Sequence, residues 1–181
     1  ELLFRHVKKV ADYEGFHGHE YPYIGWNELT KHPSGDLYDK FMSVNRVTFD
    51  PIKDTPKDLK TGRYLTPNGL PLPEIKCEVF STTNPSGPGH NWVKKRFITI
   101  APRGTVVRRS IQIYNPKTEQ EETHVITQIA IFGSYKENPY LPASYIAELE
   151  SIKEPNLRKA WLYGDWDVTA GGAIDDLWQS H

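Results

Sequence analysis

The sequence predicts a mixed α/β fold with an open sheet, and three observations support this. Two apolar segments have the character of strands, and each ends in polar residues, at residues 21–30 and 74–84. Apolar residues recur at helical spacing between them, and a β-hairpin and two helices are predicted after them. Open α/β sheets bind ligands at the carboxyl ends of neighbouring strands. The polar residues after the two strands are therefore the first candidates for a site, and they suggest nucleotide hydrolysis.

Strands in the first half of the chain are expected at residues 2–7, 21–26 and 74–80. The alternation of the last one would bury Cys77 in the sheet. A polar loop is expected at 11–20, and Ser34 is the expected N-cap of a helix. That helix has one apolar stripe, formed by Leu37, Phe41 and Val44. Five prolines and two glycines predict a long surface excursion over residues 47–73.

Helices in the second half are expected at residues 90–97, 142–152 and 155–163. The first would turn Trp92, Val93 and Phe97 inward, and Gly164 ends the last. In that last helix Trp161 lies four residues after Leu157, which favours burial of its ring. Two β-rich runs, at residues 105–114 and 123–132, predict a hairpin. The tail, residues 165–181, has the composition of a linker.

The composition limits the classes of protein to which the chain can belong. Its 181 residues can hold one domain with a full core, or one domain and part of another. The single cysteine excludes an internal disulfide framework and fits a reducing compartment. No apolar run is long enough to cross a bilayer, and the formal charge of −1 argues neither for nor against nucleic acid. Because the chain begins with Glu1, we expect a piece of a longer protein.

The first strand ends in Asn27 and Glu28. In phosphate-loop ATPases a buried strand delivers two acids to the terminal phosphate: the first holds the Mg²⁺ shell, and a following Glu polarises the attacking water. Glu28 suits the second role. Asn27 offers only a neutral oxygen, which can bond a metal-bound water without neutralising the metal. An Asn-Glu pair can also simply begin a turn.

The second strand ends in Ser81-Thr82-Thr83-Asn84-Pro85. Hydroxyl and amide groups at this position can sense whether a terminal phosphate is present. Thr, Asn and Pro also favour turns for reasons of their own, so a turn without further function remains the alternative.

Two other clusters have alternative interpretations. Cations beside aromatic residues can contact a phosphodiester backbone or form the solvated face of a helix, and here they are Lys94, Lys95 and Arg96. A possible half of a metal site consists of His17, His19 and Glu20. The loop spacing of these histidines lacks the helical spacing of zinc hydrolases, so solvated or turn histidines are the simpler interpretation.

Three stretches, taken in order, resemble the large terminase subunit of tailed bacteriophages. Residues 18–30 read Gly-His-Glu-Tyr-Pro-Tyr-Ile-Gly-Trp-Asn-Glu-Leu-Thr. Residues 82–97 read Thr-Thr-Asn-Pro-Ser-Gly-Pro-Gly-His-Asn-Trp-Val-Lys-Lys-Arg-Phe. Residues 138–141, Asn-Pro-Tyr-Leu, and 162–167, Leu-Tyr-Gly-Asp-Trp-Asp, belong to the third stretch. The resemblance spans nearly the whole chain.

This resemblance implies the C-terminal half of a RecA/ASCE-like P-loop ATPase sheet, followed by a β-hairpin and helices that form a lid or linker subdomain. The implied domains are residues 1–104 for the ATPase part, 105–164 for the lid or linker, and 165–181 for a hinge into a nuclease domain of RNase H-like fold. By residue, Asn27 would take the Walker B Asp position and Glu28 that of the catalytic Glu. The coupling motif, which links phosphate state to subdomain movement, would be Thr82, Thr83 and Asn84.

The resemblance also implies a motor that packages double-stranded DNA into procapsids, with ATP and Mg²⁺ as cofactors. The implied partners are double-stranded DNA, the terminase small subunit, the portal of the procapsid and further copies of the chain in a ring, with no membrane. The motor would work in the host cytoplasm during assembly and be absent from the mature virion. In that function the cluster Lys94, Lys95 and Arg96 would contact DNA.

The chain departs from the family pattern in ways that leave its activity open. Gly is never followed by Lys, so the core of a phosphate-binding loop, which lies upstream in the family, is absent. The nuclease carboxylates are expected beyond His181, and Asp175 and Asp176 are not assigned to catalysis. We expect the full-length parent to be an ATPase with a downstream endonuclease, and these residues alone to hydrolyse almost no ATP. The alternative is a non-catalytic, truncated or degenerate terminase-like module that binds packaging components; a nuclease acting alone has little support.

Overall fold

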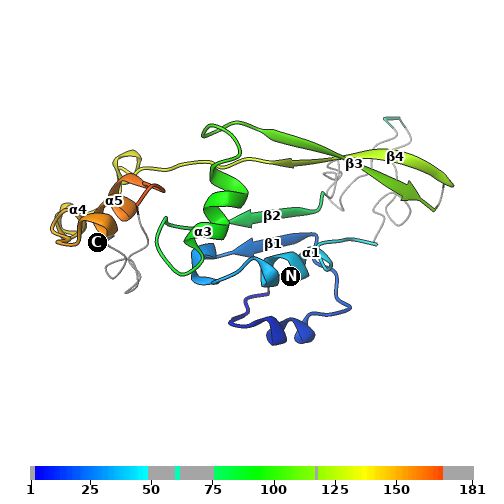
Figure 1. The fold of residues 1–181 in the computed structure, drawn as a ribbon, viewed down its shortest axis with the longest axis horizontal. Helices are drawn as coiled ribbons and strands as arrows, with labels where there is room; N and C mark the ends of the chain where they lie inside the picture. The colour runs from blue at the N-terminus through cyan, green and yellow to red at the C-terminus, as the bar shows by residue number, and fades with distance from the viewer. Residues whose placement is uncertain (1–2, 49–59, 62–75, 117, 169–181) are drawn as a thin grey trace, which may run out of the picture. The chain divides into compact units, whose positions relative to one another are not determined.

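The computed structural model describes residues 3–48, 60–61, 76–116 and 118–168. Contacts within the chain divide it into two units, which are described separately: unit 1 comprises residues 1–28 and 34–82, and unit 2 comprises residues 29–33 and 83–181. Both contain helices and a small two-stranded sheet, so the predicted mixed α/β class is confirmed (Figure 1). Among the described helices, none is long and apolar enough to span a bilayer.

The sheet of unit 1 consists of two parallel strands, β1 (Tyr23–Trp26) and β2 (Glu78–Ser81). Tyr23 pairs with Glu78 and Trp26 pairs with Ser81, so both strands end at the same edge of the sheet (Figure 1). Parallel neighbours require a crossover connection, and the chain between them carries helix α1 (Asp36–Met42). The two predicted neighbouring strands are therefore confirmed, with shorter bounds than expected.

Aromatic rings pack around Phe41 of α1 and form the core of unit 1. The ring centroids of Trp26 and Tyr13 lie 5.2 Å and 5.6 Å from that of Phe41, both edge-on, and the Phe16 centroid lies 4.9 Å away. Tyr13 belongs to a 3₁₀ helix, η1 (Val10–Gly15). Edge-on aromatic pairs add to the hydrophobic stabilisation. The predicted apolar stripe is confirmed in part: Leu37 and Phe41 lie on α1 and are buried, whereas Val44 is buried two residues after the helix ends.

The residues after α1 hold this helix to the segment that leads into β1. The backbone N–H of Tyr21 donates to the carbonyl of Val44 at 2.8 Å. The side-chain amide of Asn45 donates to the carbonyls of Tyr21 and Pro22, at 3.0 and 3.2 Å. These bonds join the residues after α1 to Tyr21 and Pro22, and they therefore fix the position of the segment that precedes β1.

Four local predictions for unit 1 are wrong. The polar loop expected at residues 11–20 begins inside the 3₁₀ helix η1, because Tyr13 is buried against Phe41. Residues 3–7 form no strand, because no described segment pairs with them. Gly35 is the N-cap of α1, since the hydroxyl of Ser34 donates to the charged carboxylate of Asp36 at 2.8 Å. Cys77 is exposed because β2 begins one residue after it, so the alternation of a paired strand does not reach it. Most of the predicted excursion, including residues 49–59, lies outside the described residues.

Unit 2 begins with a short 3₁₀ helix, η2 (Leu29–Lys31), and continues with α3 (His90–Val93) and the π-helical turn η3 (Lys94–Ile98). The predicted helix at 90–97 is confirmed, with a widened last turn. Val93 is buried, whereas the rings of Trp92 and Phe97 are half-buried and meet edge-on at 6.3 Å.

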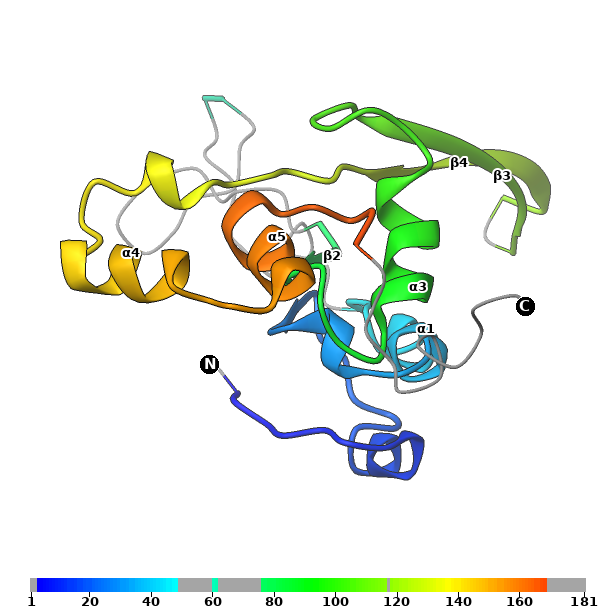
Figure 2. The same cartoon turned by 60° about the vertical axis from the view of Figure 1, so that its left-hand side comes forward.

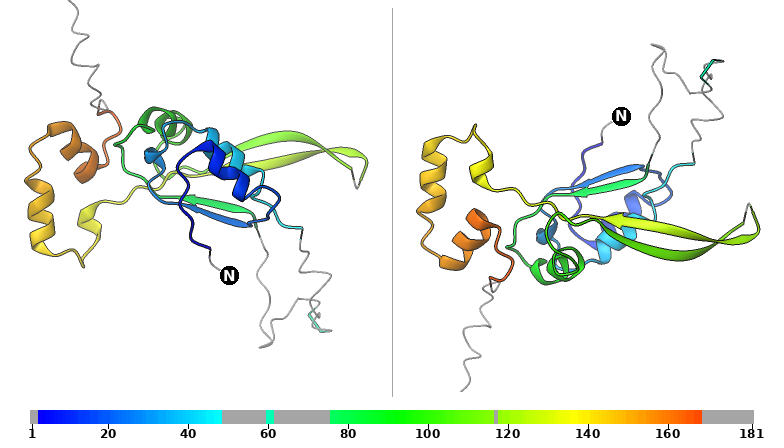
Figure 3. Two further views of the ribbon diagram at one scale, coloured as in Figure 1. Left: turned by 90° about the horizontal axis from the view of Figure 1, so that it is seen from below. Right: turned by 90° about the horizontal axis from the view of Figure 1, so that it is seen from above.

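An antiparallel hairpin follows, formed by β3 (Val107–Asn115) and β4 (Gln120–Gln128), and it confirms the predicted one (Figure 3). Its turn is shorter than expected, because the hydroxyl of Thr118 and the amide of Asn115 donate to the Glu122 carboxylate at 2.7 and 2.9 Å. The same two donors, Thr118 first, lower the pKa of the Glu122 carboxyl below its ordinary value. These bonds close the loop and let β4 begin early.

The last described elements are η4 (Tyr135–Glu137), α4 (Ala143–Glu150) and α5 (Pro155–Tyr163), as Figure 2 shows. The predicted pair of helices is confirmed. Glu154 caps α5 by accepting from the backbone N–H groups of its first turn, and Gly164 ends the helix with a left-handed φ of 58°.

Candidate functional site

Asn27 and Thr82 directly follow the two strands of unit 1 and contact each other. The backbone N–H of Thr82 donates to the carbonyl of Trp26 at 2.9 Å, which extends the strand pairing by one residue. The Thr82 hydroxyl donates to the side-chain oxygen of Asn27 at 3.0 Å. Two of the site residues predicted from the sequence are thus brought together, and both are exposed.

Glu28 is exposed and has an unusual backbone conformation, with a φ of 54°. For a residue with a side chain, this left-handed region costs roughly 1–2 kcal/mol. The turn directs the N–H of Glu28 at the Thr82 hydroxyl, 3.4 Å away. Glu119, in the turn of the hairpin, has the same φ, so the value is typical of a tight turn. The conformation sets where the Glu28 side chain leaves the sheet.

Thr83 and Asn84 belong to unit 2, where both contact Thr30. The N–H of Thr30 donates to the Thr83 hydroxyl oxygen at 3.1 Å, and the Thr30 hydroxyl donates to the Asn84 carbonyl at 3.1 Å. Thr30 is buried, and sequence reasoning missed it. The available signal was its position two residues after Glu28, in the polar segment that follows the predicted strand.

The turn at residues 87–89 packs directly against the backbone of η2. The N–H of Gly89 donates to the carbonyl of Thr30 at 2.8 Å. A Cβ atom on Gly89 would lie 2.1 Å from the carbonyl oxygen of His32. The indole N–H of Trp92 donates to that same oxygen at 2.7 Å. Glycine is therefore required at position 89 by the close approach of two backbones.

Two tryptophans near the end of the described chain contact residues 86–90 within unit 2. The Trp161 indole N–H donates to the Ser86 hydroxyl at 2.9 Å. The Trp166 ring lies 5.3 Å from that of His90, a buried residue whose Nδ1 is hydrogen-bonded to the Pro85 carbonyl. The predicted burial of Trp161 is wrong, since 47% of the residue is exposed. The hydrogen bond to Ser86 holds its indole at the surface.

The three cations of the predicted basic cluster have different surroundings. The Lys94 ammonium forms an ion pair with Asp167 at 2.8 Å, whereas Lys95 is exposed. The Arg96 guanidinium lies 5.7 Å from the centroid of the Phe97 ring. Lys95 is therefore better exposed to a polyanion than Lys94, whose charge already has a partner.

Removing the Lys94 charge should raise the pKa of Asp167 toward its ordinary value. Lys94 lowers that pKa through its hydrogen bond and then through its charge. Because the folded-state pKa is lowered, the ionised carboxylate stabilises the fold above the ordinary pKa, and this contribution is lost as the pH falls through the folded value. The expected result is an upward shift in Lys94→Met, measured by NMR titration of Asp167. The matched control Lys95→Met should leave the titration unchanged; an unchanged midpoint in both variants contradicts the ion pair.

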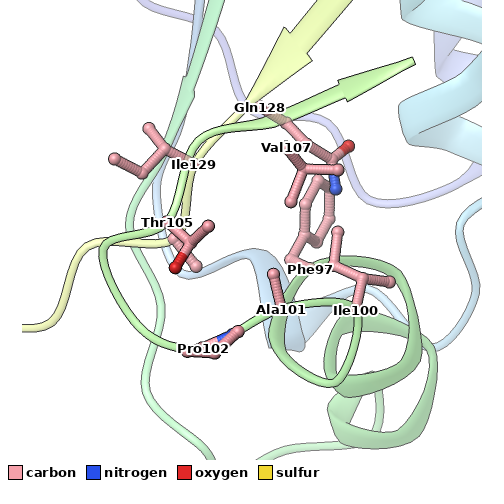
Figure 4. Close-up of a pocket in the computed structure, with 9 residues that line it drawn as sticks. Phe97, Ile100, Ala101, Pro102, Thr105, Val107, Gln128 and Ile129 are labelled. Carbon is pink, nitrogen blue, oxygen red and sulfur yellow. The ribbon is translucent and has the colours of Figure 1, made fainter.

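A shallow apolar hollow lies at the base of the hairpin in unit 2, between the end of η3 and the two strands (Figure 4). Its floor includes Phe97 and Val107, and at its edge the Gln128 amide donates to the carbonyl of Arg96 at 3.2 Å. None of the site residues predicted from the sequence lines it. The hydrogen bond from Gln128 to Arg96 joins η3 to the hairpin beside this hollow.

Within the described residues, no group of three His, Cys, Asp or Glu side chains is placed to hold a metal ion. Glu20, from the possible half-site, accepts instead from the N–H and hydroxyl of Thr48 at 2.9 and 2.7 Å. The N–H bond and then the hydroxyl bond lower the pKa of the Glu20 carboxyl. The half-site interpretation therefore has no support in the structure.

Asn27, Glu28 and Thr82, which follow the two strands of unit 1, each carry a side-chain oxygen atom that could bind a metal ion. All three residues are exposed. Oxygen ligands, often a single carboxylate together with waters and substrate phosphates, are what Mg²⁺ prefers. The residue types are therefore compatible with a Mg²⁺ site.

A family model described as the phage terminase large subunit matches residues 60–164, more than half of the chain. The matched range includes β2, the segment Thr82–Asn84, the basic cluster, the hairpin and helices α4 and α5. It does not include β1, so the assignment of Glu28 depends on the parallel pairing of β1 with β2. No curated protein and no solved structure matches the chain.

Proposed function

Since the chain belongs to the phage terminase large subunit family, we propose that it is part of the ATP-driven motor that packages double-stranded DNA into procapsids. The observation that carries the proposal is the family match over the segment containing Thr82–Asn84. The pairing of β1 with β2 supports it, because it brings Asn27 into contact with Thr82. In this proposal the two strands belong to a RecA-like ATPase sheet.

Each residue has a specific role in this proposal. The Glu28 carboxylate polarises the attacking water as a general base, and the Asn27 side-chain oxygen orients a water. ATP and Mg²⁺ are the proposed cofactors, and the metal supplies charge neutralisation at the phosphates. Thr83 and Asn84 respond to the state of the terminal phosphate. Thr82 holds Asn27 in place through its hydroxyl, as it does in the structure.

The complete gene product provides the test. It should hydrolyse ATP in the presence of Mg²⁺, and double-stranded DNA together with procapsids should increase the rate. Absence of turnover under all these conditions refutes the motor. The second candidate, a non-catalytic module that binds the small subunit or portal, is favoured by one observation: the neutral Asn27 at the acid position already accepts a hydrogen bond from Thr82. That candidate is supported if the inactive protein still binds those components.

Lys95 is the most accessible of the proposed DNA contacts. We expect Lys95→Ala to reduce the slope of log K against log salt for DNA binding by about 1, because one phosphate contact is lost. Lys94→Ala should change the slope less, since Lys94 is paired with Asp167. The measurement is a fluorescence titration of duplex DNA with the complete gene product at several salt concentrations. Equal slopes for Lys95→Ala and wild type contradict the contact.

A further inference from the structure

Thr30 directs all three of its polar atoms at one stretch of chain, residues 83–89. Its N–H donates to the Thr83 hydroxyl at 3.1 Å, its hydroxyl donates to the Asn84 carbonyl at 3.1 Å, and its carbonyl accepts from the N–H of Gly89 at 2.8 Å. The two hydroxyl oxygens of Thr30 and Thr83 lie 3.0 Å apart. Thr30 is 2% exposed, so water has little access to replace these bonds.

The position of Thr30 in the chain gives these bonds a second consequence. The chain runs from Glu28 through Leu29 to Thr30, and from Thr82 directly to Thr83. In unit 1 the two stretches are joined by the bond from Thr82 to Asn27, and in unit 2 they are joined again by the bonds of Thr30. The same two stretches of chain are thus tied together within each unit.

We propose that Thr30 is a positioning residue of the motor. Through its bonds to Thr83 and Asn84, its hydroxyl makes these two residues move together with the stretch of chain that carries Glu28. This inference rests on the proposed function. Thr30 touches neither nucleotide nor metal in this role. It acts on the reaction through Asn84, whose carbonyl it holds, and so determines how a change at the phosphate reaches the segment beyond Thr83.

A purely structural role predicts a different experimental result. Valine has nearly the shape of threonine, so Thr30→Val removes the hydroxyl while it keeps the packing. If Thr30 only stabilises a buried turn, the variant lowers the amount of folded protein. Hydrolysis and packaging then fall in the same proportion, because each intact molecule still works normally.

The test measures ATP turnover and packaged DNA in the same reactions, using the complete gene product with procapsids. We expect Thr30→Val to lower the length of DNA packaged per ATP by about threefold to tenfold or more, because the variant loses the bond that the Thr30 hydroxyl donates to Asn84 and the bond that it accepts from Thr83. The KM for ATP should stay unchanged. Thr30→Ser keeps the hydroxyl and should restore the ratio. The matched control Thr99→Val removes an exposed hydroxyl from unit 2 and should have no effect.

The outcomes are distinguishable. An unchanged DNA-to-ATP ratio in Thr30→Val overturns the positioning role, whether or not the yield of folded protein falls. Failure of Thr30→Ser to restore the ratio also overturns it, because the hydroxyl would then not be the responsible group. If the wild-type protein hydrolyses no ATP, the proposed function itself fails, and this is seen before any variant is compared.

Discussion

Glu28→Gln should lower ATP turnover by the complete gene product by roughly 10²–10⁴-fold, the usual contribution of a general base. The amide has nearly the size of the carboxylate but cannot accept a proton from the attacking water. The backbone bond from the residue 28 N–H to the Thr82 hydroxyl does not involve the side chain and should persist. The loss should therefore appear in kcat, with the KM for ATP little changed. The measurement is steady-state phosphate release at saturating ATP and Mg²⁺.

Two variants make this result specific. Glu14→Gln makes the same chemical change at an exposed position in η1 and should leave the rate unchanged. Asn27→Asp places a carboxylate at the proposed Walker B position and should leave turnover equal or raise it, because a charged oxygen supports the metal shell better than a neutral one. Turnover retained in Glu28→Gln would exclude Glu28 as the base.

Local signals in the sequence predicted the elements whose ends are set by neighbouring residues. The helix at 155–163 was predicted at its observed bounds, because Pro155 and Gly164 act on the backbone directly. The hairpin followed from two β-rich runs, and the neighbouring positions of the ends of β1 and β2 followed from the polar residues after each strand. Each of these depends on nearby residues or on a simple topological rule.

Residues whose role is set by partners far along the chain were missed or placed wrongly. Thr30 forms hydrogen bonds with Thr83 and Asn84, which lie more than fifty positions away along the chain. The spacing of residues in the sequence does not indicate such contacts. Trp161 has helical spacing from Leu157, yet its indole is held at the surface by Ser86 in a distant loop. The shift of the N-cap from Ser34 arose because a neighbouring carboxylate captured its hydroxyl. In these cases tertiary contacts outweighed the local preference.

Gly89→Ala should destabilise the protein by about 3 kcal/mol or more. The added Cβ would lie 2.1 Å from the His32 carbonyl oxygen and 3.0 Å from that of Thr30, and both are backbone atoms of the same short turn. Overpacking of this kind costs roughly 1–3 kcal/mol. Relief of the clash would also break the bonds from Gly89 to Thr30 and from Trp92 to His32, which contribute roughly 1 kcal/mol each.

Urea denaturation compares this variant with Gly15→Ala, since a Cβ on Gly15 would meet nothing within 4 Å. We expect a clearly lower midpoint for Gly89→Ala and a change of no more than about 1 kcal/mol for Gly15→Ala. The functional consequence follows from the same geometry, because a displaced Gly89 releases the carbonyl of Thr30 and loosens the segment that carries Asn84. Equal midpoints for the two variants would mean that the segment at 87–89 does not pack against η2, and the positioning role of Thr30 would lose its structural basis.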